Sequence, residues 1–123
     1  MQERTVHRFE VLECSIEAIV LLREVERKIR QRDRDLAEQI RTAASSAALN
    51  LGEADGSQGG NRMERLRTAA GSNSEVRTAL RVAAAWGYVE AAEIAAVDGK
   101  LDRIAAILYR LNDVRARIAA RGG

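Results

Sequence analysis

Proline is absent from this sequence of 123 residues, and aromatic residues make up only 3% of it. Hydrophobic residues nevertheless reach 46%, so the apolar content is mostly Ala, Leu, Ile and Val. This composition is typical of packed helices. It predicts an all-α protein and argues strongly against an all-β fold.

The chain also has only one cysteine, Cys14, and one histidine, His7. A single cysteine cannot form an internal disulfide, which indicates a reducing compartment. A zinc site or a carboxylate-bridged di-iron site needs more histidine or cysteine than the chain contains. We therefore expect no metal, no cofactor, no small-molecule substrate and no enzymatic activity, with Cys14 as a buried apolar residue.

Long apolar runs are missing as well. No stretch approaches the roughly 20 apolar residues that a membrane span requires, and the start of the chain lacks the pattern of a signal peptide. The charges are balanced, with 20 Lys and Arg against 18 Asp and Glu. Such a balance is typical of helix surfaces laced with ion pairs and indicates nucleic-acid binding only weakly. We expect a cytoplasmic protein without membrane contact.

Apolar residues recur at helical spacing in four segments, and polar or glycine-rich breaks separate them. The predicted helices cover about 5–30, 35–54, 61–86 and 90–120. Short connections between long helices force neighbours to run in opposite directions. The sequence therefore predicts a single domain, 1–123, folded as an antiparallel up-down-up-down four-helix bundle.

Local signals predict where the helices begin and end. Asp35 followed by Glu38, and Asn61 followed by Glu64, have the spacing of capping boxes at the starts of the second and third helices. Gly87 stands where a left-handed C-terminal cap is usually found, so it should end the third helix.

The first helix is apolar over an unusually wide arc. Phe9, Leu12, Ile16 and Ile19 form one apolar stripe at helical spacing. Further apolar positions lie to one side of that stripe, namely Val11, Ala18, Leu22, Val25 and Ile29. This excess favours self-association, because another copy of the chain could cover it. The alternative is that a few of these side chains stay partly exposed, as on any surface.

Two asparagines interrupt apolar stripes. Asn50 is in register with alanines and leucines of the second helix, and Asn73 lies between Ala70 and Val76 in the third. A buried amide without a hydrogen-bond partner costs about 1–3 kcal/mol, so both should be bonded. We interpret them as polar residues that fix the register between the second and third helices rather than as a ligand site.

The sequence around these asparagines resembles the four-helix bundle proteins of the 23S rRNA intervening-sequence type, and the similarity covers Phe9 to Leu111. The matching residues are Ser46, Asn50, Glu53, Gly71, Ser72, Ser74, Glu75, Gly87 and Tyr88. This resemblance implies a homopentamer built from four-helix protomers. It extends to the accessory variability proteins of diversity-generating retroelements, a related branch whose members bind a reverse transcriptase and nucleic acid.

Two functions are compatible with these features. The first is a non-enzymatic scaffold or adaptor that self-assembles and presents a surface to a protein partner. The alternative is an accessory protein that contacts the phosphates of RNA or DNA through arginines. The candidates for that role are Arg30, Arg32 and Arg34 at the first break, and Arg62, Arg65 and Arg67 at the start of the third helix. An up-down-up-down bundle places these two groups at opposite ends, and aromatic residues for base stacking are scarce.

Overall fold

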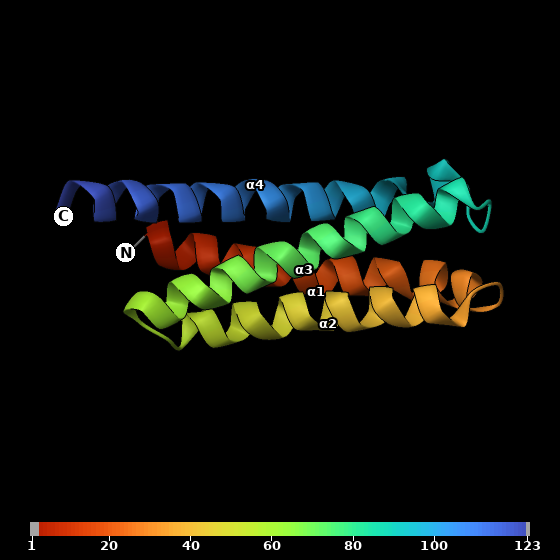
Figure 1. The fold of residues 1–123 in the computed structure, drawn as a ribbon, viewed down its shortest axis with the longest axis horizontal. Coiled ribbons are helices and arrows are strands. Elements are labelled where there is room, and N and C mark those ends of the chain that lie inside the picture. The colour runs from red at the N-terminus through yellow and green to blue at the C-terminus, as the bar shows by residue number, and fades with distance from the viewer. Residues whose placement is uncertain (1–2, 123) are drawn as a thin grey trace.

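The computed structural model describes the backbone of residues 3–122 and the side chains of residues 10–113. Its four helices are α1 (Glu3–Arg30), α2 (Arg34–Asp55), α3 (Gly59–Ala85) and α4 (Ala91–Gly122). No strand occurs in that stretch of backbone. The fold is an all-α four-helix bundle, with the helices lying along a common long axis (Figure 1).

Each helix packs mainly against two others, since α1 and α3 both contact α2 and α4. The connection between α1 and α2 and the connection between α3 and α4 lie at one end of the bundle, while the connection between α2 and α3 lies at the other (Figure 1). Ion pairs between α1 and α4 join Glu17 to Lys100 and Lys28 to Glu93. Residues later in α1 therefore pair with residues earlier in α4.

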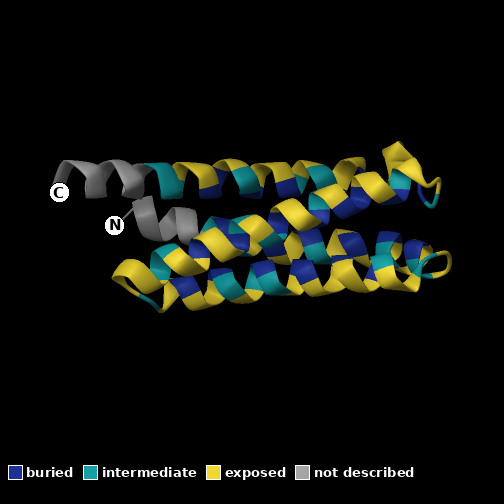
Figure 2. Ribbon diagram, viewed as in Figure 1, coloured by how far each residue is buried: buried dark blue, intermediate teal, exposed yellow. Residues whose placement is uncertain are grey.

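The core runs along the inward sides of all four helices (Figure 2). Its largest completely buried apolar side chains are Ile29, Ile40, Leu80, Ile104, Leu108, Val11, Val76 and Val97. Alanines such as Ala37, Ala69 and Ala83 are also fully buried. The small alanine side chains fill the space between the larger core side chains.

The structure shows which part of the wide apolar arc of α1 lies in the core. The buried positions are Val11, Cys14, Ala18, Leu22, Val25 and Ile29. In contrast, Leu12 and Ile19 are half-buried and Ile16 is exposed, while the side chain of Phe9 lies outside the described residues. The physical reason is that only one side of α1 stays apolar along its length. The side of α1 that carries Ile16 and Ile19 continues into the charged Arg23 and Glu26, whereas the buried side stays apolar to the end of the helix.

The predicted capping residues of α2 and α3 were wrong by two and three residues. Asp33, not Asp35, caps α2, because its backbone is extended and its Oδ1 accepts a hydrogen bond of 2.9 Å from the Leu36 amide. Helix α3 begins at Gly59 after Gln58, which makes no side-chain cap bond. Asn61 is therefore already helical, and its capping box does not form.

The predicted end of α3 is confirmed. Gly87 has a φ of 80°, in the left-handed region that favours glycine. The Tyr88 amide donates to the Ala83 carbonyl at 2.9 Å, and the Gly87 amide donates to the Ala84 carbonyl at 3.0 Å. This pair of bonds is a Schellman motif, which satisfies carbonyls that the helix end would otherwise leave free.

Candidate functional site

A polar network joins α2 to α3. The Ser72 hydroxyl donates to the Ser46 hydroxyl at 3.0 Å, and the Asn50 amide nitrogen donates to the Ser46 carbonyl at 2.9 Å. Arg65 donates to Asn50 Oδ1 at 3.2 Å and pairs with Glu53 at 2.8 Å. Four of the residues that carry the family resemblance therefore lie together, with Arg65 added from the predicted phosphate-binding group. The network holds the two helices in register.

Three other residues of the resemblance lie outside this network. Gly71, Ser74 and Glu75 are exposed on α3. A Cβ built on Gly71, or on Gly52 of α2, would meet no atom within 4 Å. These two glycines therefore do not mark a close approach between helices.

Asn73 connects a different pair of helices from the one predicted. Its side chain is only 2% exposed, and its amide nitrogen donates to the Leu101 carbonyl of α4 at 3.0 Å. Its Oδ1 has no hydrogen-bond donor. Asn73 therefore fixes α3 against α4, while Asn50 fixes α2 against α3, and the two amides serve separate contacts.

Tyr88 ties together the two connections at one end of the bundle. Its hydroxyl donates to Asp33 Oδ2 at 3.3 Å, while the other oxygen of that carboxylate caps α2. The Arg32 guanidinium lies 5.4 Å from the centre of the Tyr88 ring, within the range of a cation–π contact. Partial burial raises the pKa of the Tyr88 hydroxyl, and the Asp33 carboxylate raises it further. Gly87 and Tyr88, which belong to the family resemblance, therefore have a structural role at this end of the bundle.

The first group of predicted phosphate-binding arginines lies around the connection between α1 and α2. Arg30 pairs with Glu26 and with Glu38, and these two carboxylates raise its pKa. Arg32 packs on Tyr88, and Arg34 is exposed. Arg30 is therefore held by ion pairs, whereas Arg32 and Arg34 are both exposed.

The second group lies at the start of α3, at the other end of the bundle. Arg62 donates to the Ala54 carbonyl at 3.3 Å, and Arg65 is held by Asn50 and Glu53. Arg67 is exposed. The two groups are separated along the bundle, as predicted, and three of the six arginines form hydrogen bonds or ion pairs within the chain.

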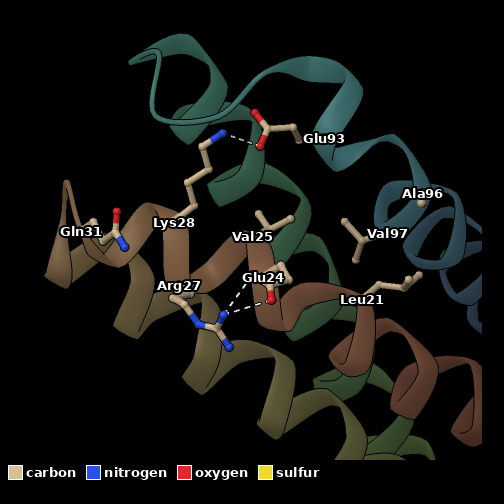
Figure 3. Close-up of a pocket in the computed structure, with 9 residues that line it drawn as sticks. All are labelled: Leu21, Glu24, Val25, Arg27, Lys28, Gln31, Glu93, Ala96 and Val97. Atoms are coloured by element: carbon tan, nitrogen blue, oxygen red, sulfur yellow. Dashed lines mark hydrogen bonds and ion pairs between the residues drawn. The ribbon is translucent and has the colours of Figure 1, made fainter.

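Ion pairs across the outer surface, which no local sequence pattern predicted, join α4 to α1 and α3. Arg103 pairs with Glu10, and Lys28 pairs with Glu93 beside an open groove of about 490 Å³ between α1 and α4 (Figure 3). Arg77 of α3 reaches Asp98 at 3.0 Å and Asp102 at 3.3 Å, which raises its pKa. No local signal could have found these pairs, because partners so far apart in sequence are chosen by the packing.

Exposed apolar residues gather on the outer side of α1. Ile16 is 44% exposed and Val20 is 55% exposed. Leu49 on the neighbouring helix α2 is 68% exposed. The wide apolar arc of α1 is therefore real, and the chain's own fold leaves its outer part uncovered.

The chain has one cysteine and one histidine. Cys14 is a free, buried thiol, as predicted, and His7 lies outside the described side chains. Among residues 10–113, no three His, Cys, Asp or Glu side chains lie close enough together to hold a metal ion. None of the helices, within their described residues, is long and apolar enough to cross a membrane.

These features define a class: an all-α four-helix bundle protein whose polar residues join helices and whose first helix carries an uncovered apolar face. A family model described as 23S rRNA-intervening sequence protein matches residues 7–110. The chain belongs to this family, which confirms the resemblance seen in the sequence. No curated protein and no solved structure gave a match.

Proposed function

We propose that this protein is a non-enzymatic scaffold that assembles with copies of itself and binds a protein partner. The observation that supports this proposal is the apolar outer face of α1, where Ile16 and Val20 remain exposed although the core is complete without them. Uncovered apolar surface of this kind marks a protein contact more often than a catalytic site. The free, buried thiol of Cys14 agrees with a cytoplasmic location.

The protomer proposed for this assembly is an antiparallel up-down-up-down bundle. Contacts between neighbouring helices support that arrangement, because residues later in one helix contact residues earlier in the next. Between α2 and α3, for example, Ser46 contacts Ser72 whereas Ala54 contacts Arg62. Membership of the intervening-sequence family supports a ring of five such protomers, the assembly that the resemblance implies.

A protein partner is favoured over nucleic acid. Of the six arginines considered for phosphate contact, Arg30, Arg62 and Arg65 already bond to groups within the chain. The remaining candidates are divided between the two ends of the bundle. A dispersed set of cations binds a polyanion weakly, because the affinity depends on how many phosphates are neutralised together.

Native mass spectrometry tests the assembly. The expected result is a complex with five times the mass of the 13.5-kDa chain, or a multiple of that complex. Dilution should dissociate it, since self-association depends on concentration. A mass of one chain at the highest accessible concentration would contradict the proposal.

A further inference from the structure

One line of side chains on α1 is turned away from the core and follows a regular pattern. Its members are Glu13, Ile16, Val20, Arg23 and Arg27, and we call this line the α1 outer seam. Their spacing alternates between three and four residues, which is the spacing of a helix that packs against another helix. All five are exposed within the single chain.

The seam divides by charge. Ile16 and Val20 form its apolar centre, Glu13 lies before that centre, and Arg23 and Arg27 follow it. Arg27 pairs with Glu24 on its own helix, whereas neither Glu13 nor Arg23 has an ion-pair partner among the described residues. The seam therefore offers one free negative charge and one free positive charge on either side of an apolar contact.

We propose that the α1 outer seam binds the same seam of a second copy, with the two α1 helices antiparallel about a two-fold axis level with Ala18. In that arrangement, Ile16 lies opposite Val20 of the second copy, and Glu13 lies opposite its Arg23. Each pairing occurs twice, because a two-fold contact is self-complementary. The inference deepens the proposed self-assembly and depends on it.

The charges select this arrangement over others. Two parallel copies would place Glu13 against Glu13 and Arg23 against Arg23, and like charges at close range repel. A nucleic-acid strand along the seam would meet Glu13 and would cover Ile16 and Val20 without any matching apolar surface. An antiparallel second copy satisfies both the apolar centre and the charged flanks.

The two-fold contact predicts how many chains the assembly contains. A two-fold seam joins copies in pairs, while a ring of five uses a different surface on each side of every protomer. Combined with the ring, the seam joins two rings into a complex of ten chains. Without the ring, it gives a dimer.

Charge reversal tests the seam in the full chain. Glu13→Arg or Arg23→Glu alone places like charges opposite each other twice in each contact, so pairing should weaken by about tenfold or more. The double variant, Glu13→Arg with Arg23→Glu, exchanges the charges and should restore pairing to within about threefold of the original. Sedimentation velocity over a range of concentrations measures the mass of the assembly. The mass should halve in each single variant and return to the original value in the double variant.

Matched controls separate the seam from general charge effects. Glu64→Arg and Arg81→Glu make the same charge changes at exposed positions of α3 and should leave the assembly mass unchanged. Val20→Asp should abolish pairing, because it places two carboxylates near the apolar centre. All these positions are exposed, so circular dichroism should show the same helix content and melting as in the unmodified protein.

The outcomes distinguish the seam from the wider proposal. An assembly of five whose mass no reversal changes overturns the seam and leaves the ring standing. A dimer that the single reversals split and the double reversal restores supports the seam and overturns the ring. A double variant as defective as the single ones overturns the seam, since the loss would then not arise from the Glu13–Arg23 pairing.

Discussion

At the scale of single residues, Asn73 is a buried polar side chain whose hydrogen bonding is incomplete. It is the one buried asparagine in the described part of the chain, and it gives its single hydrogen bond to the Leu101 carbonyl across the contact between α3 and α4. Its Oδ1 is left without a donor, a cost that an apolar residue would avoid. The bond fixes which turn of α3 faces which turn of α4, and so it sets the register of that helix pair.

Changing Asn73 to aspartate tests that role. The new carboxylate would face the Leu101 carbonyl with no donor between them, so Asn73→Asp should lower the free energy of unfolding by about 3 kcal/mol or more at neutral pH. Burial would raise the pKa of the carboxyl above its value in the unfolded chain. The folded state then binds more protons, so the variant should regain stability as the pH falls. Urea unfolding at several pH values measures this, and a variant as stable as the original at neutral pH would contradict it.

At the scale of helices, the ends are determined by backbone geometry as much as by side chains. Gly87 ends α3 in a left-handed conformation, and Gly99 lies in the exposed interior of α4. A Cβ would meet no atom within 4 Å at either position. Any difference between substitutions at these two glycines therefore reflects the backbone and not crowding.

Two alanine substitutions should consequently have opposite effects. Gly87→Ala should destabilise the protein by about 1–2 kcal/mol, because an L residue is strained at that φ. Gly99→Ala should stabilise it by about 0.5–1 kcal/mol, because alanine loses less entropy than glycine in a helix. Thermal unfolding of the two variants beside the original protein tests both signs. Equal shifts in one direction would show that Gly87 does not end the helix as described.

At the scale of the whole molecule, the bundle separates residues that hold the protomer together from residues available to other copies. Leu80 is fully buried in the core, while Leu49 on α2 is mostly exposed. Both are leucines in the middle of long helices, but Leu80 lies on the apolar stripe of α3 and Leu49 lies off the stripe of α2. Their different surroundings predict different consequences of mutation.

Leu80→Ala should lower the free energy of unfolding by about 2–5 kcal/mol, because it removes buried methyl groups and leaves a cavity. Leu49→Ala should change protomer stability by less than about 0.5 kcal/mol and should weaken self-association instead. Chemical unfolding and sedimentation measured on both variants check this division. Comparable losses of stability in the two variants would place Leu49 in the protomer's own core and remove it from the assembly surface.

The sequence by itself determined the helical class, the approximate helix ranges, the end of α3 at Gly87 and the family. Each of these depends on local chemistry: helical periodicity, a glycine at a left-handed position, or short motifs of matching residues. The sequence also showed that α1 is apolar over too wide an arc for one core.

Only the tertiary structure decided which part of that arc lies inside. The stripe that contains Val11 and Ile29 is buried because it stays apolar along the whole contact with α2 and α4, while Ile16 and Val20 are left outside. The same packing assigned Asn73 to α4 and not α2, and brought Asp33 to Tyr88. Burial and long-range pairing depend on where other helices lie, and no local pattern contains that information.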